Sequence, residues 1–120
     1  MSGGRVVEIE AYERGTHLNV ARATNGGQAR ASSVVQPYPP RYAINGDRVS
    51  YGWLGQVPFT FPGWLQVDFD SIKTVDEVDV FSYQDPPAVP PTETLTFTRY
   101  GLTDFEVQYW DGTAWVTVPG

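Results

Sequence analysis

Apolar and polar residues alternate along much of the chain with the period of two that is typical of half-buried β-strands. The first such stretch, residues 5–12, places Val7, Ile9 and Ala11 on one face and glutamates on the other. Asp111-Gly112 lies between the last two stretches and favours a tight hairpin turn. No segment has helical periodicity beyond a turn or two. The further predicted strands are residues 28–33, 64–70, 75–83, 94–100, 103–110 and 115–118.

This pattern predicts an all-β fold, a mostly antiparallel β-sandwich. The 120 residues suffice for one domain with one modest core. Twelve glycines and ten prolines interrupt the chain too often for long helices. We expect the core to contain the alternate apolar side chains of the strands, namely Leu65, Val67, Phe69, Val78, Val80, Phe105, Val107 and Tyr109.

Three proline-rich segments separate the predicted strands, and the first two also carry aromatic side chains. Proline fixes the backbone, so such loops can hold rings for binding at little entropic cost. The same prolines could instead only end strands and protect sheet edges. The segments are 36–41, 52–63 and 85–93, and the rings in them are Tyr38, Trp53, Phe59 and Phe61.

The net charge of −6 excludes some partners. Residues 1–60 hold six arginines against four acids, whereas residues 61–120 hold ten acids against Lys73 and Arg99. Binding to phosphate backbones needs many cationic contacts, so nucleic acids and anionic membranes are poor partners. No apolar run approaches the roughly 20 residues of a membrane span. There are no cysteines for disulfides or thiolate metal sites.

Catalysis has little support in the sequence. The one histidine, His17, has no nucleophile motif beside it. Carboxylates two residues apart on a strand, such as Glu8 and Glu10, share the solvent face instead of facing each other across a cleft. We therefore expect no enzyme. The turn 43–47 is rich in oxygen atoms and could hold a hard cation, or could be simply a tight turn.

An ordered series of motifs points to a family, although no single motif would. The series resembles the discoidin family, also called coagulation factor 5/8 type C domains, over about residues 19–118. The resemblance implies a galactose-binding-like β-sandwich, or jelly roll. The motifs are Asn19-Val20-Ala21, Ala31-Ser32-Ser33, Tyr42–Asp47, Trp53, Trp64–Phe69, 75–81, 102–110 and 115–118.

Bacterial members of that family resemble carbohydrate-binding modules of the family-32 type. The resemblance therefore implies a non-catalytic module, extracellular or at the cell surface, that binds a glycan with loop aromatics and polar side chains. The alternative is a structural or adhesion module that binds protein or assembles with itself. The candidate ligand-binding residues are Tyr38, Arg41, Trp53, Phe59, Phe61 and Tyr83.

The chain departs from the family pattern at its ends. Family domains continue for two or three strands beyond the segment 115–118, and their last strand resembles residues 5–12 of this chain. The chain could span the join of two modules, be a permutation, or exchange strands with a second copy. We expect residues 5–12 to pair within the sandwich, with 1–18 as strand and linker and 19–118 as the core, and a homo-oligomer formed at the open edge.

The resemblance also implies a structural calcium ion between the turn 43–47 and a glutamate of the last strand. Carried over, its ligands are the carboxylates of Asp47 and Glu8 and the carbonyls near Ala43 and Ser50. This site requires residues 5–12 to occupy the position of the final strand.

Overall fold

A computed structural model describes residues 5–49, 51–55, 63–82 and 106–118. Within these ranges the predicted all-β class is confirmed, since every paired strand is antiparallel and the helical structure is limited to two 3₁₀ turns. No helix in the described ranges is long and apolar enough to cross a membrane. The elements are β1 (Arg5–Val6), β2 (Glu8–Glu13), η1 (Ala23–Asn25), β3 (Gln28–Ala31), η2 (Pro40–Ala43), β4 (Trp53–Leu54), β5 (Leu65–Asp68), β6 (Val75–Phe81), β7 (Gln108–Trp110) and β8 (Trp115–Thr117).

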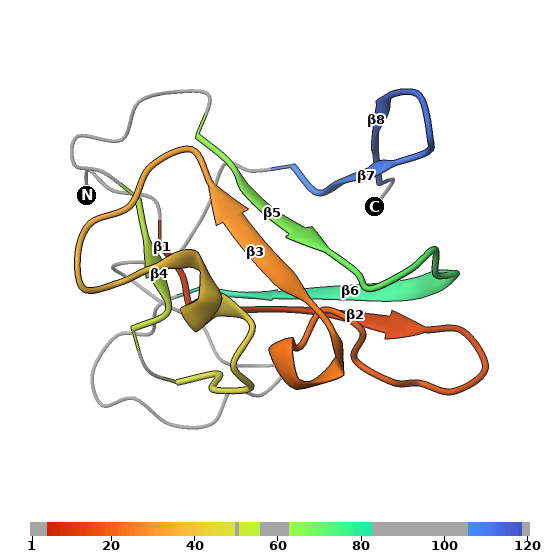
Figure 1. Ribbon diagram of the computed structural model, residues 1–120, viewed down its shortest axis with the longest axis horizontal. Coiled ribbons are helices and arrows are strands. Elements are labelled where there is room, and N and C mark those ends of the chain that lie inside the picture. The colour runs from red at the N-terminus through yellow and green to blue at the C-terminus, as the bar shows by residue number, and fades with distance from the viewer. Residues whose placement is uncertain (1–4, 50, 56–62, 83–105, 119–120) are drawn as a thin grey trace.

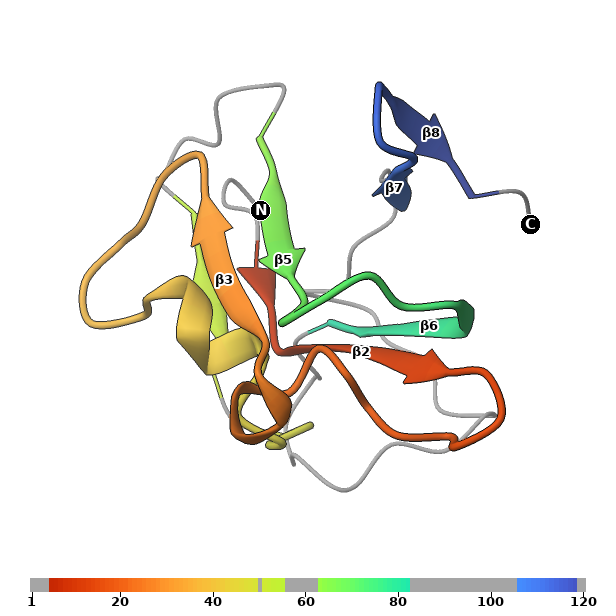
Figure 2. The same ribbon diagram turned by 45° about the vertical axis from the view of Figure 1, so that its right-hand side comes forward.

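Two antiparallel ladders, β2–β6 and β3–β5, cross each other as two layers in both views (Figures 1 and 2). The core lies between them. Ile9 and Val78 pack into it from the first layer, and Ala29 and Val67 from the second. The alternation read from the sequence accounts for this, because it puts one apolar face of each strand toward the other layer.

The N-terminal run is a strand of the fold, as predicted. It bends at Val7, so that β1 pairs with β4 and β2 pairs with β6. Val7 itself donates its N–H to the carbonyl of Phe81 at 2.8 Å. The outward face of β2 differs from our expectation: Glu8 and Glu10 are buried, because the segment after η2 lies over them.

The most buried part of the core comes from the first half of the chain. The predicted core residues of β5 and β6, with Phe69, are half-buried and pack around this centre. Tyr109 was wrongly predicted to be buried: it is 51% exposed on the β7–β8 hairpin, which lies to one side of the two layers (Figure 2). Phe105 and the segment 94–100 lie outside the described residues. The buried hydrophobic residues are Val6, Val7, Ala11, Val20, Ala21, Ala43, Ile44 and Trp53.

Candidate functional site

Segments that are distant in sequence, 5–8 and the described parts 38–49 and 51–54, meet in the fold. Arg5 pairs with Leu54 in the β1–β4 ladder, and Leu54 donates its N–H to the carbonyl of Tyr38 at 3.2 Å. Gly52 crosses so close to the first strand that a Cβ there would overlap the Val6 carbonyl. The backbone of this region is therefore fixed by strand pairing and by the lack of a side chain at Gly52.

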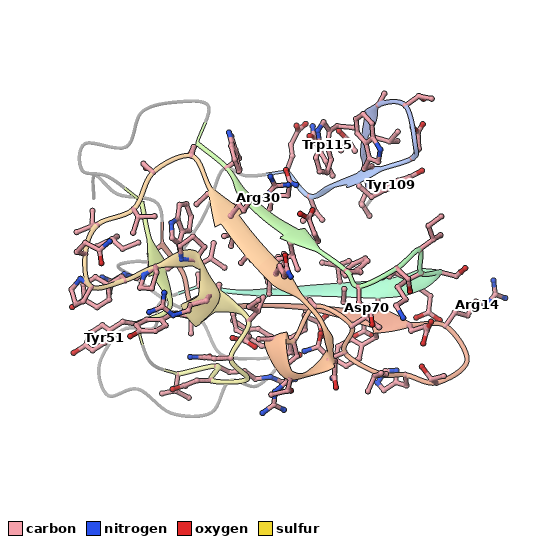
Figure 3. The ribbon with its side chains drawn as sticks, in the orientation of Figure 1. Arg14, Arg30, Tyr51, Asp70, Tyr109 and Trp115 are labelled. Carbon is pink, nitrogen blue, oxygen red and sulfur yellow. The ribbon has the colours of Figure 1, made fainter. Side chains whose placement is uncertain are left out.

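An aromatic and cationic group lies on this backbone, and we call Arg5, Tyr38 and Tyr51 the tyrosine cluster. The two rings have centroids 5.4 Å apart and an interplanar angle of 51°. The Arg5 guanidinium carbon lies 5.1 Å from the Tyr38 centroid and 5.5 Å from that of Tyr51. Tyr51 is 51% exposed and lies at the edge of the molecule, at the far side from the β7–β8 hairpin (Figure 3). Tyr51 is thus an exposed ring, with the half-buried Tyr38 beside it.

The other sequence-predicted binding residues do not all join this cluster. Arg41 is exposed on η2, with its guanidinium carbon 5.4 Å from the centroid of the Tyr42 ring. Trp53 was wrongly placed among the ligand-binding rings: it is 2% exposed, and its indole N–H donates to the Ser33 carbonyl at 2.9 Å. Phe59, Phe61 and Tyr83 lie outside the described residues. Of the predicted set, Tyr38 and Arg41 remain at the surface of the described structure.

The carboxylate of Glu8 is buried beside the turn that follows η2. Its Oε2 accepts the backbone N–H of Gly46 at 2.8 Å, and its Oε1 has no hydrogen-bond partner among the described residues. Burial raises the pKa of Glu8 to about 8, with a further contribution from Glu10, although the N–H of Gly46 acts in the opposite direction. A buried carboxylate with one free oxygen is suited to gain either a proton or a cation.

Residues 43–49, which we call the cation loop, supply further oxygen atoms beside Glu8. Asp47 accepts the N–H of Val49 at 2.9 Å, while its own N–H donates to the side chain of Asn45 at 3.0 Å. Gly46 has a φ of +88°, and a Cβ there would lie 2.7 Å from the Arg22 guanidinium carbon. No three His, Cys, Asp or Glu side chains gather anywhere in the described ranges, so a cation here would also take backbone carbonyls.

These features fit the residues that the sequence suggested for a hard cation. Glu8 and the loop of Ala43 and Asp47 are together, and the free oxygen of Glu8 is buried. Ser50 lies outside the described residues. The position of Glu8 follows from the pairing of the N-terminal strand, as that suggestion required.

Next to Glu8, Glu10 forms a tight ion pair that the sequence did not reveal. Arg48 binds it in a bidentate manner, with Nε and Nη2 at 2.8 and 2.6 Å from the two carboxylate oxygens. The Tyr12 hydroxyl also donates to Glu10. Burial alone would raise the pKa of Glu10, but the hydrogen bonds of Arg48 and Tyr12 outweigh it and lower that pKa. Glu10 is therefore held as a carboxylate by structural partners.

Sequence reasoning missed Arg5, Tyr51 and Arg48. Arg5 and Tyr51 are separated by more than forty residues, and only the pairing of β1 with β4 brings them together. The one usable signal for Arg48 is its place directly after the Asn45–Asp47 turn, where it can reach across to an adjacent strand.

The family of NedA-like, galactose-binding domains, of the coagulation factor 5/8 type C kind, matches residues 42–120. The match spans well over half of the chain, and the chain belongs to this family. The matched residues include the whole cation loop and Tyr51, whereas Arg5, Glu8 and Tyr38 precede them. No curated protein and no solved structure gives a significant match.

Proposed function

We propose that this domain is a non-catalytic carbohydrate-binding module that works outside the cell or at its surface. Membership in a family described as galactose-binding supports a sugar ligand. The observation that carries the proposal is the tyrosine cluster, in which one guanidinium lies over two tyrosine rings at the surface.

The chemistry of the cluster suits a sugar. A hexose presents a C–H patch that packs on an aromatic face and a rim of hydroxyls that needs hydrogen-bonding groups. Tyr51 offers an exposed ring, and the phenol hydroxyls and the Arg5 guanidinium offer donors beside it. Arg41, exposed on η2, extends the polar rim. A shallow site of this kind binds weakly, with a Kd on the order of 0.1–1 mM.

The carboxylates of β2 support binding without catalysis. Glu10 is engaged by Arg48 and Tyr12, and Glu8 is fully buried beneath the cation loop. A glycoside hydrolase needs two carboxyl groups that both reach the bond to be cleaved. Neither Glu8 nor Glu10 is placed to do so.

A calcium ion at the cation loop is the second part of the proposal. Glu8 and Asp47 would hold it with their carboxylates, together with backbone carbonyls near Ala43 and Ser50. When bound, the ion would supply a positive charge that neutralises the buried Glu8 and links β2 to the loop. The Oε1 of Glu8, which is buried and has no hydrogen-bond partner in the described part of the chain, supports this assignment.

Calorimetric titration with galactose, beside a glycan array, tests the sugar proposal. Wild-type protein should bind, and Tyr51→Ala should lose at least ten-fold in affinity, about 1.4 kcal/mol. Tyr109→Ala is a matched control, since both tyrosines are 51% exposed and Tyr109 lies on the separate hairpin (Figure 3). If the wild type binds nothing on the array, or if both variants weaken binding equally, the proposed site is wrong.

The alternative, a module that binds protein or assembles with itself, is favoured by the β7–β8 hairpin. Tyr109 and Trp115 are each about half exposed, and Trp110 packs edge-on against Trp115 with centroids 5.6 Å apart. Exposed aromatic groups of this size are typical of interaction surfaces. Sedimentation velocity across a concentration series separates the two functions: a dimer lost in Tyr109→Ser, with no sugar bound, would favour the alternative.

A further inference from the structure

The tyrosine cluster and the cation loop are built from the same two short segments. We propose that they are coupled, so that a calcium ion bound at the cation loop raises the affinity of the tyrosine cluster for sugar. The inference rests on the proposed function, because it concerns the regulation of that same site.

The first connection is the N-terminal strand. Arg5 of the cluster and Glu8 of the cation site are three residues apart on β1 and β2, with Val6 and Val7 between them. Both intervening side chains are buried, and Gly52 is in close backbone contact with both residues. A displacement of Glu8 toward or away from the loop therefore cannot be absorbed by a flexible spacer.

The second connection is the chain that runs from Tyr38 through η2 and the cation loop to Tyr51. The loop lies between the two tyrosines in sequence, and its first two residues, Ala43 and Ile44, are buried. The hydrogen bond from Leu54 N–H to the Tyr38 carbonyl closes this chain on itself. Both rings thus lie at the ends of the segment that would bind the ion.

The link to Glu8 limits how freely this segment can move. Without an ion, the loop is joined to β2 by the hydrogen bond from Gly46 N–H to Glu8 Oε2 and by the bonds of Arg48 to Glu10 and Tyr12. An ion shared by Glu8 and Asp47 would add a link through the carboxylate of Asp47 and so restrict Tyr51, four residues further along. When a sugar then binds and orders the same rings, the protein loses less conformational entropy than it would without the ion. The two ligands therefore favour each other's binding, which is positive coupling.

Coupling between two binding sites is reciprocal, so the sugar must tighten calcium binding by the same factor. Couplings of this kind are typically about 5-fold to 150-fold. Because the path here is short, we expect the galactose Kd to be at least about five-fold lower in calcium than in chelator.

Nuclear magnetic resonance of the full chain tests the inference, with calcium and galactose as the two titrants. Calcium chloride alone should shift the amide signals of Gly46 and Asp47 and also those of Tyr38, Tyr51 and Gly52. Galactose titrations should give a Kd that is lower in calcium than in chelator. Calcium titrations should give a Kd that is lower with galactose than without it, by the same factor. Glu8→Gln should abolish both the calcium-induced shifts and the difference in galactose affinity between the two buffers. Glu77→Gln, the same change at an exposed residue of β6, is the matched control.

The results of these titrations support or contradict the coupling between the cation loop and the tyrosine cluster. Calcium shifts confined to the loop, equal galactose affinities in both buffers, or no calcium binding at all would overturn the coupling. If galactose binds in neither buffer, galactose binding at this site fails as a function, but the calcium shifts at Tyr38 and Tyr51 still support or refute the link. If Glu8→Gln loses the dispersed spectrum of a folded protein, Asp47→Asn takes its place.

Discussion

Gly46 donates its backbone N–H to one oxygen of the Glu8 carboxylate at 2.8 Å, and the other oxygen is buried without a partner among the described residues. A buried polar atom left unpaired costs about 1–3 kcal/mol. Glu8 therefore reduces the stability of the fold unless a proton or a cation satisfies the second oxygen.

Stability in chelator should fall as the pH rises toward 8. Burial raises the pKa of Glu8 from 4.5 to about 8, so between these values the folded chain holds a proton that the unfolded chain has lost. Because the folded state then binds more protons, unfolding becomes easier as the pH rises. Burial and a hydrogen bond with Glu77 raise the pKa of Asp79 to about 6, which adds to the slope only at lower pH.

Thermal melts of the wild type and of Glu8→Gln from pH 6 to pH 8 measure this effect, because that window lies between the two raised pKa values. The wild-type Tm should decline across the window and the variant Tm should stay nearly level. Saturating calcium should abolish the wild-type decline, since the ion binds the carboxylate form. A wild-type Tm that is flat in chelator would show that Glu8 ionises normally.

Arg48→Met should strongly destabilise the protein at neutral pH. The substitution leaves the buried Glu10 without its bidentate partner. Breaking a fully buried ion pair costs about 3–5 kcal/mol, and because the Arg48 side chain is 43% exposed we expect a smaller loss, about 2–3 kcal/mol. Part of the loss should be recovered below neutral pH, where Glu10 can take up a proton. Arg30→Met is the control: its salt bridge with Asp68 is exposed, so the cost should stay below about 1 kcal/mol. Urea unfolding measures the free energy of unfolding of both variants. Equal losses in Arg48→Met and Arg30→Met would show that the burial of Glu10 does not matter.

The strand pattern predicted the two-layered part of the fold because the apolar face of each strand there is covered by the other layer. Val67 and Val78 pack where the alternation placed them. Tyr109 follows the same alternation on β7, yet it is exposed. Among the described strands β7 pairs only with β8, and this hairpin has no second layer over it. Periodicity indicates which face of a strand is apolar but not what covers that face.

The candidate site was only partly predictable for a related reason. Tyr38 and Glu8 were found from loop composition and from the family resemblance, which are local or ordered signals. Arg5 and Tyr51 meet through the pairing of β1 with the two-residue strand β4, too short to give any alternation. Trp53 looked like a loop aromatic because the same short strand was not recognised, and it packs in the core instead.

Gly52→Ala should destabilise the fold by more than about 3 kcal/mol, because a Cβ would overlap the backbone of Val6 and Val7 and the residue has a φ of +65°. Gly112→Ala separates these causes. Gly112 has a φ of +106° but no atom within 4 Å of the Cβ position, so only backbone strain, about 1–2 kcal/mol, should appear. Equal losses in denaturant melts would mean that the close approach of Gly52 to the first strand is not required.

Removal of residues 1–13 should abolish cooperative folding. The segment supplies Val6, Val7 and Ala11 to the core, and each fully buried valine contributes about 1.5–3 kcal/mol. Its removal also leaves β4 and β6 without β1 and β2, the strands with which they pair. Together these losses approach the 5–15 kcal/mol that stabilises a typical domain.

The control removes residues 1–4, which precede β1. A synthetic peptide of residues 5–13, added to the truncated chain, should restore a thermal transition if strand pairing is the cause. A truncated chain that melts cooperatively without the peptide would show that the N-terminal strand is dispensable, and would remove Glu8 and Arg5 from the proposed sites.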